Sequence, residues 1–184
     1  LLFQETVQRS AGALLEHSNL ITKTIFPSEV IPVSVFLSSL INHLIATVLL
    51  VLAVIFWDDG ISPMIAFMPV YVVLVGLLAV GLGWVVASLN VYLRDTAQIV
   101  QVFMTLWFWV TPIFITRELV PERFQFLVAW NPLSYVVRAY REMMLSMDFP
   151  SFQEMGLLAV FSFAVFIGGG LFFRTLKRGF ADVL

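Results

Sequence analysis

Long uninterrupted apolar runs dominate the chain and predict four membrane-spanning helices. The runs cover 33–57, 64–89, 97–115 and 155–173, and none shows the alternating polarity of a barrel strand. Each is close to the ~20 residues that an α-helix needs to cross ~30 Å of hydrocarbon. Because only helices and closed barrels satisfy their backbone groups in lipid, we predict an all-α polytopic helical bundle that forms a single domain over 1–184.

The polar positions between the runs predict the orientation of the bundle. The Asp58-Asp59 turn after the first run has no Lys or Arg, whereas Arg94 joins the second and third runs and a basic tail follows the fourth. Lys and Arg in short loops stay on the cytoplasmic side. We therefore expect the Asp58-Asp59 turn and the long segment 116–154 to be external, and the Arg94 joint and the tail to be cytoplasmic.

The long segment between the third and fourth runs predicts two short external helices over about 122–147. Asn131-Pro132 breaks the segment, and an apolar stripe at helical spacing starts after it with Leu133, Val136 and Tyr140. The pair is either an interfacial hairpin that caps the bundle or a re-entrant gate over a central path. The candidate gate residues are Trp130, Asn131, Pro132, Tyr140 and Arg141.

The segment that precedes the first run has a helical pattern over 5–25, with charges spread between apolar positions. Pro27 and Pro32 then stop one helix and open another, because neither has a backbone N–H to donate. Two interpretations remain open. The segment is an amphipathic helix on the membrane surface, or 18–26 is a short cytoplasmic helix that docks into a partner.

The third run contains the most unusual polar pattern. Two amides and a hydroxyl recur at i, i+3 and i+7, and three consecutive aromatic rings follow near mid-depth, although aromatic belts usually lie at headgroup level. This face either hydrogen-bonds to neighbouring helices or lines a translocation path with flat rings. The candidate path residues are Gln98, Gln101, Thr105, Trp107, Phe108 and Trp109.

Other features of the runs predict helix packing. Ala79, Gly83 and Ala87 form a ridge of small residues, and three glycines at 168–170 lie in the fourth run; both patterns favour close helix contact. Asn42 and His43 lie inside the first run, where hydrogen bonding to a neighbouring helix is the simpler explanation. No acidic residue lies within the predicted spans, which argues against a proton relay.

Composition excludes several classes of function. Hydrophobic residues make up 60% and charged residues 12% of the chain, against about 25% charged in a soluble domain. The net charge of −2 gives no attraction to nucleic acid. Paired carboxylates, a His-Glu metal spacing, a serine nucleophile elbow and a phosphate-binding glycine loop are all missing from the sequence. We therefore predict no catalytic or metal-ligating residue and no cofactor, and place any ATPase on another protein.

Five short motifs occur in chain order at predicted helix ends and in the external segment. They are 19–32 (from Asn19-Leu20-Ile21 through FPSEVIP), 93–95 (LRD), 111–113 (TPI), 130–133 (WNPL) and 140–141 (YR). In this order they resemble the membrane permease of type-2 ATP-binding-cassette (ABC) exporters. The branch that they resemble exports O-antigen, capsule or teichoic acid polymers.

The resemblance implies a six-span permease of the cytoplasmic (inner) membrane, of which this chain lacks the N-terminal part. Residues 1–13 would end the second span, and the four predicted spans would be the third to sixth. It also implies a homodimer around the polymer path, and a separate ABC ATPase subunit that binds the ATP. The implied ATPase-coupling residues are Ser18, Asn19, Leu20, Ile21, Lys23, Phe26 and Pro27.

The predicted function is that of a permease subunit of an ATP-driven ABC exporter that moves a lipid-linked polysaccharide. One alternative is the same architecture exporting small drugs or lipids. The other is a membrane channel or scaffold subunit that works without an ATPase, which would form no stable complex with one.

Overall fold

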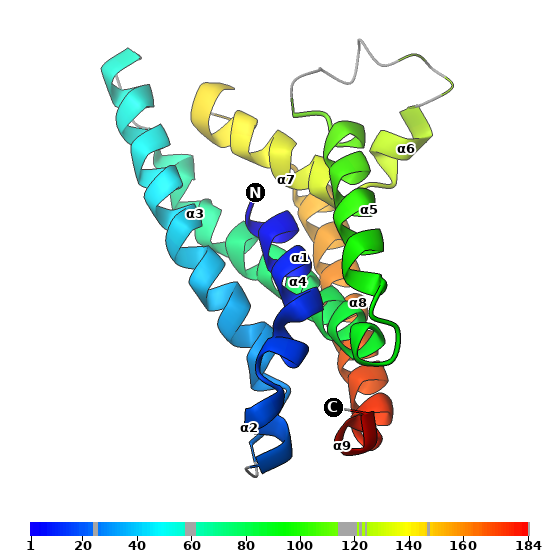
Figure 1. Ribbon diagram of the computed structural model, residues 1–184. Helices are drawn as coiled ribbons and strands as arrows, with labels where there is room; N and C mark the ends of the chain where they lie inside the picture. Colours follow the sequence, from blue (N-terminus) through cyan, green and yellow to red (C-terminus); the bar gives the residue numbers. More distant parts are fainter. Residues whose placement is uncertain are drawn as a thin grey trace.

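The computed structural model describes residues 1–23, 26–57, 62–113, 121, 123, 125–146 and 148–183. The Asp58-Asp59 turn lies outside these ranges. The regular structure of the described residues is helical (Figure 1). The helices are α1 (Leu2–Glu16), α2 (Ser18–Lys23), α3 (Val30–Trp57), a 3₁₀ turn (Pro63–Phe67), α4 (Met68–Tyr92), α5 (Thr96–Val110), α6 (Gln125–Ala129), α7 (Pro132–Arg141), a π turn (Glu142–Ser146), α8 (Phe152–Lys177) and α9 (Phe180–Val183).

Long apolar helices cover three of the four predicted spans. Helices over Val30–Phe56, Pro63–Tyr92 and Phe152–Lys177 are long and apolar enough to cross a membrane. The predicted span over 97–115 was wrong in its extent, because α5 has only 15 residues and ends at Val110. Thr111 is extended, with ψ of 127°, since a residue before proline avoids the helical region. At 1.5 Å per residue, α5 is about 22 Å long and shorter than the hydrocarbon core.

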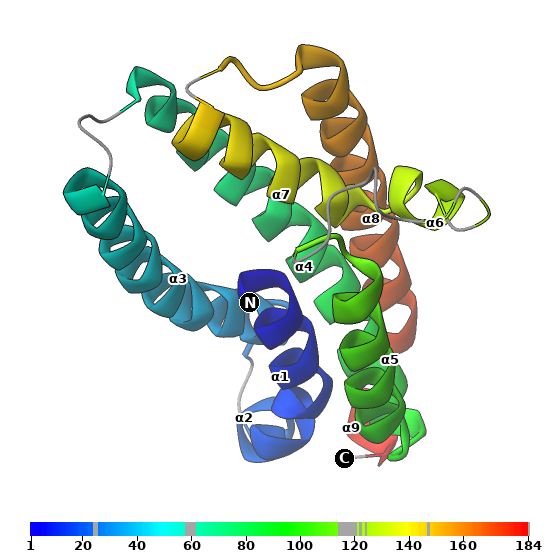
Figure 2. The ribbon, with the colours of Figure 1, turned by 90° about the horizontal axis from the view of Figure 1, so that it is seen from above.

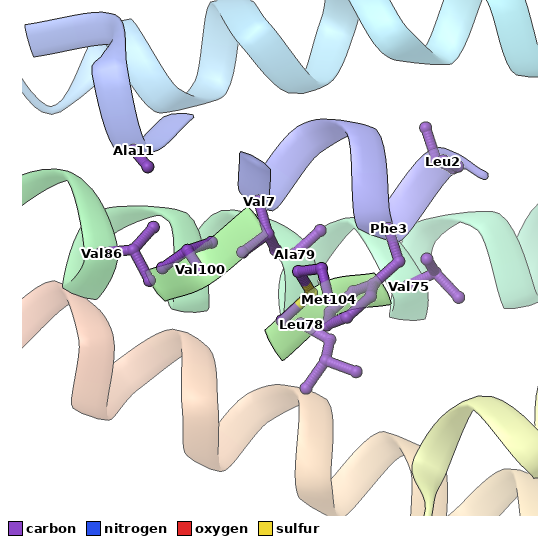
Figure 3. Packing of buried hydrophobic residues seen from close by; sticks show 10 residues of the cluster. All are labelled: Leu2, Phe3, Val7, Ala11, Val75, Leu78, Ala79, Val86, Val100 and Met104. Carbon is purple, nitrogen blue, oxygen red and sulfur yellow. The ribbon is translucent and has the colours of Figure 1, made fainter. Parts of the chain in front are cut away.

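Helix α1 lies on α4, between α3 and α5, and packs against all three helices (Figures 1 and 2). Its buried apolar residues meet those of α4 and α5 in the cluster that Figure 3 shows: Leu2, Phe3, Val7, Ala11, Val75, Leu78, Ala79, Val86, Val100 and Met104. The interpretation of 5–25 as a membrane-surface helix is therefore wrong for α1. Its position agrees with the end of a membrane span, as the resemblance implies.

Small residues allow α4 to pack closely against α8 and α1. A Cβ built on Gly169 would lie 2.1 Å from the carbonyl oxygen of Gly81, so only a glycine fits there. On another side of α4, a Cβ on Gly83 would lie 3.0 Å from Oγ of Ser10 in α1. Ala79 and Ala87 are fully buried. These contacts confirm the close packing that the small-residue pattern predicts.

The charges of the helix ends agree with the predicted orientation. Helices α2 and α9 and the junction of α4 with α5 lie at one end of the bundle, and α6, α7 and the C-terminal end of α3 lie at the other (Figure 1). The first end carries Arg94 and the basic residues 174, 177 and 178. We call it the cytoplasmic end.

Candidate functional site

One side of α1 is polar although the helix packs against three others. Gln4, Glu5, Gln8 and Arg9 occupy i, i+1, i+4 and i+5 and are partly or fully exposed, opposite the buried apolar side. Nη1 of Arg9 donates to Oε1 of Glu5 over 3.2 Å, and the two side chains are 50% and 32% exposed. The sequence shows this polar stripe, but its depth in the membrane follows only from the packing of α1.

Helices α3 and α5 extend the polar side of α1 on both flanks. Nδ2 of Asn42 in α3 donates to Oε1 of Glu5 over 3.2 Å, and Nε2 of Gln8 lies 3.5 Å from the carbonyl oxygen of Gln101 in α5. Ser38, one turn before Asn42, is also exposed. We call the following set the polar wall: Gln4, Glu5, Gln8 and Arg9 of α1, Ser38 and Asn42 of α3, and Gln98, Gln101 and Thr105 of α5.

The polar wall includes an acidic residue, Glu5, on a helix outside the four predicted spans. Glu5 lies at the depth of Asn42, which is near the middle of α3. A charged side chain at the centre of a bilayer costs at least ~2.5 kcal/mol, so such residues face protein or a water-filled cavity. The exposed side of the polar wall is therefore a poor surface for lipid.

The structure divides the predicted path residues between two places. Gln98, Gln101 and Thr105 are exposed on α5, and Trp109, one turn after Thr105, is 72% exposed. Trp107 and Phe108 are half-buried and line a cavity of about 210 Å³ between α1, α3, α4, α5 and α7. Consecutive helical residues point about 100° apart, so the three adjacent rings do not share one face.

The predicted gate residues connect α7 to α3 and to the chain that follows α5. The side chain of Asn131 accepts a hydrogen bond from the backbone N–H of Leu133 over 3.0 Å and donates to Oγ1 of Thr111 over 2.9 Å. Oη of Tyr140 lies 3.4 Å from Nε2 of His43. A guanidinium N–H of Arg141 donates to the carbonyl oxygen of Ile113.

Asn131 and Pro132 thus end α6 and begin α7, as the break in the pattern predicts. Trp130, the remaining gate residue, is 74% exposed. Arg138 of α7 also pairs with Glu154 of α8. The role of these residues as a gate stays a prediction. Residues 122, 124 and 147 of the predicted helix pair lie outside the described residues.

The predicted coupling residues are split between a short helix and the chain that follows it. Helix α2 spans Ser18–Lys23 and lies, with α9, at the cytoplasmic end (Figure 1). Asn19 is exposed, Leu20 is 42% exposed, and Ile21 packs against the core. Phe26 is 37% exposed and precedes Pro27 outside the helix. The side chain of Lys23 lies outside the described residues.

An ion pair joins this segment to the last span. Nζ of Lys177 donates to both carboxylate oxygens of Glu29, over 2.8 and 2.7 Å, and Nε1 of Trp84 donates to the backbone oxygen of Glu29 over 2.9 Å. Burial acts to raise the pKa of Glu29, but the hydrogen bond and charge of Lys177, a backbone N–H and the charge of Arg174 outweigh it, so the pKa is lowered. Glu29 and Lys177 are far apart in the chain, and nothing in the sequence pairs them.

A sequence profile described as "ABC-2 type transporter" matches residues 14–145, which is more than half of the chain. The chain belongs to the ABC-2 type transporter family. As a member of this family, it is a multi-pass membrane protein and a transport subunit. The match runs from the last turn of α1 to the π turn that follows α7.

This ABC-2 transporter subunit has curated relatives that cover almost all of its length. It is 26% identical to the "O-antigen export system permease protein RfbA" of Klebsiella pneumoniae, over 99% of the chain and 70% of that protein. It is 24% identical to the protein of the same name in Myxococcus xanthus, over 98% of the chain and 70% of that protein.

Proposed function

We propose that this ABC-2 transporter subunit is the permease of an ATP-driven exporter that moves a lipid-linked polysaccharide, such as an O-antigen, across the cytoplasmic membrane. The relatives are named for O-antigen export, which supports this cargo. The single observation that carries the proposal is the polar wall across α1, α3 and α5. Its amides and hydroxyls offer hydrogen bonds to sugar hydroxyls, and its only described ion pair, Glu5–Arg9, is internally neutral.

The polar wall also supports a homodimer. Lipid cannot hydrogen-bond to the exposed amides and the ion pair, so protein or water has to cover them. A second copy of the chain that faces the polar wall would enclose a hydrated path between two such walls. A small apolar drug offers few groups that could form hydrogen bonds with a path of this chemistry.

The energy comes, in this proposal, from a separate ATPase subunit that binds ATP and contacts α2 and the following segment. ATP can shift the permease between two arrangements only if the complex binds it better in one of them. The contacts of Glu29 with Lys177 and Trp84 would carry a movement of the coupling segment to α8 and α4. The chain itself would need neither a cofactor nor a catalytic residue.

ATP-dependent uptake of a lipid-linked glycan into inverted vesicles tests this function. The vesicles contain the ATPase and the full-length permease. The permease is either the wild type or a double variant in which Gln98 and Gln101 are both changed to Leu. We expect the variant to co-purify with the ATPase and to lose most of the glycan transport. The control is Val160→Leu, at a position of α8 that is 68% exposed, which should transport normally. If the double variant transports glycan at the wild-type rate, Gln98 and Gln101 do not line the polysaccharide path.

A further inference from the structure

A groove of about 580 Å³ lies at the cytoplasmic end of the bundle, between α4, α8 and the segment that precedes α3. The proposed coupling uses the contacts of Glu29 with Trp84 and Lys177 at its wall, but not the open space between them. Its walls include Trp84, Phe166, Ile167, Gly170, Arg174 and Lys177. The groove therefore combines an aromatic and aliphatic wall with two cationic side chains.

The sequence of α8 arranges these wall residues along the membrane normal. Ile167, Gly170, Arg174 and Lys177 follow one another at spacings of three or four, so they share one face of the helix. At 1.5 Å per residue, Arg174 lies about 10 Å from Ile167 along the axis. Because Lys177 ends α8 at the cytoplasmic side, the cations lie at headgroup level and the apolar wall lies deeper, beside the acyl chains.

Trp84 and Gly170 determine the shape of the groove. The Trp84 and Phe166 rings lie 4.9 Å apart, and the hydrogen bond from Nε1 of Trp84 to the backbone of Glu29 holds the indole in place. A Cβ on Gly170 would lie 3.3 Å from Cζ3 of Trp84. Any larger side chain at position 170 would therefore fill space that the groove now leaves open.

The groove keeps an excess of positive charge. Glu29 neutralises one of its two cations through the bonds from Lys177, and Arg174 is exposed. The Lys177 ammonium has three donors, of which two are used by Glu29, and its side chain is 37% exposed. An anion at headgroup level can therefore contact both Arg174 and Lys177 without breaking the Glu29–Lys177 pair.

We propose that this groove binds one anionic phospholipid of the cytoplasmic leaflet. The lipid phosphate contacts Arg174 and Lys177, and an acyl chain lies along Phe166 and Ile167. Basic pockets between transmembrane helices on the cytoplasmic side recognise anionic headgroups in this way. The site is independent of the exported cargo. Because Pro27 and Glu29 also line the groove, the bound lipid stabilises the connection between the coupling segment and α8.

Basic residues at helix ends also meet headgroups without forming a site, simply by reaching the interface. Arg178 provides the matched control for this case. It is an exposed cation at the same end of α8, and it is not among the residues that line the groove. Gly168 is the control for Gly170, because a Cβ there would meet no atom within 4 Å.

Native mass spectrometry of the full-length permease with its ATPase measures the proposed binding. The probes are phosphatidylglycerol and phosphatidylcholine with identical acyl chains, and glycerol phosphate as a headgroup without acyl chains. We expect one phosphatidylglycerol per chain, retained about fivefold better than phosphatidylcholine, which is the order of effect for one cation at an anionic lipid surface. Glycerol phosphate should not displace the lipid.

The variants decide between a site and general attraction. Arg174→Gln and Gly170→Leu should abolish the preference for phosphatidylglycerol, whereas Arg178→Gln and Gly168→Leu should retain it. The proposal would be overturned if Arg174→Gln and Arg178→Gln reduced the preference for phosphatidylglycerol equally. Equal binding of the two lipids by the unaltered complex would also overturn it. Displacement by glycerol phosphate would show a soluble phosphate site instead. If Gly170→Leu fails to assemble with the ATPase, the two arginine variants still decide the question.

Discussion

The carboxylate of Glu29 accepts two hydrogen bonds from Nζ of Lys177, across 148 positions of the sequence. The pair connects the segment after α2, where the ATPase is proposed to act, with the end of the last span. The indole of Trp84 binds the backbone of the same residue. Three elements of the bundle, α3, α4 and α8, therefore meet at one acidic residue on the cytoplasmic side.

Breaking this pair should reduce coupling more than stability. Both side chains are about one-third exposed, and such ion pairs contribute only ~0.2–1 kcal/mol to stability. We therefore expect Lys177→Met to shift the unfolding temperature slightly and to lower the glycan transported per ATP hydrolysed. Arg178→Gln is the control. If Lys177→Met left the glycan transported per ATP unchanged, the Glu29–Lys177 pair would not transmit movement from the coupling segment to α8.

The Glu29–Lys177 pair should also make stability depend on pH. The pKa of Glu29 is lowered from an ordinary value of 4.5, so its contribution is fully present above about pH 5 and is lost as pH falls through the lowered pKa. We expect the difference in unfolding temperature between the wild type and Glu29→Gln to shrink as pH falls from 6 towards 3. If the difference in unfolding temperature stayed constant between pH 6 and pH 3, the ionised Glu29 carboxylate would not be the source of this stabilisation.

Glu142, in the external π turn, should show the opposite sign. Burial, the Glu154 carboxylate and Asp148 raise its pKa, and Arg138 only partly compensates. A raised pKa means that the charged form weakens the folded state, so stability is lost as pH rises through that pKa. We expect Glu142→Gln to raise the unfolding temperature at pH 8 and to have little effect at pH 4. Thermal denaturation in detergent at both pH values measures this.

The contact of Gly81 with Gly169 should tolerate no side chain. A Cβ on Gly169 would meet the backbone of α4 at 2.1 Å, and backbone cannot move aside as a flexible side chain can. Overpacking costs ~1–3 kcal/mol, and Gly169→Leu should fall at the upper end of this range. Gly168→Leu, which enters open space, should leave the unfolding temperature nearly unchanged. If both variants lowered the unfolding temperature by a similar amount, the cause would be the loss of a glycine in this part of α8 and not the contact of Gly169 with Gly81.

Removing the side chain of Asn131 should weaken the attachment of α7. The residue caps α7 and binds Thr111, and loss of an N-cap costs ~0.5–2 kcal/mol. We expect Asn131→Ala to speed hydrogen exchange in α7 and to slow glycan transport. Asn131→Ser, which can still cap the helix, should protect α7 better. Equal exchange rates in the wild type and Asn131→Ala would exclude this role.

The sequence predicted the elements that depend on length and local chemistry. Apolar runs identified α3, α4 and α8, and Asn131-Pro132 placed the start of α7. The end of α5 was missed because the apolar run continues past Val110, while Pro112 keeps Thr111 extended.

The missed parts of the site depend on packing between distant segments. An amphipathic helix has the same periodicity whether its polar side faces water at a membrane surface or a hydrated path inside a bundle. The sequence pattern of Glu5 and Arg9 is therefore equally typical of a surface helix, and only the hydrogen bond from Asn42 places Glu5 beside α3. Trp107 and Trp109 are neighbours in the sequence, but only the structure shows that one lines a cavity and the other is exposed.

The central claim is that the polar wall faces a hydrated path for a polysaccharide. The 184-residue sequence contains no cysteine, so a single introduced thiol reports its own surroundings. The full-length permease, freed of any other thiol, is assembled with its ATPase and carries either Gln101→Cys in the wall or Val160→Cys on α8. A membrane-impermeant thiol reagent is then applied, with and without lipid-linked glycan and ATP.

We predict that Gln101→Cys reacts with the reagent, that glycan and ATP together protect it, and that Val160→Cys stays unreactive in lipid. An unreactive thiol at position 101, or a reaction that the glycan does not slow, would contradict a polysaccharide path along this wall.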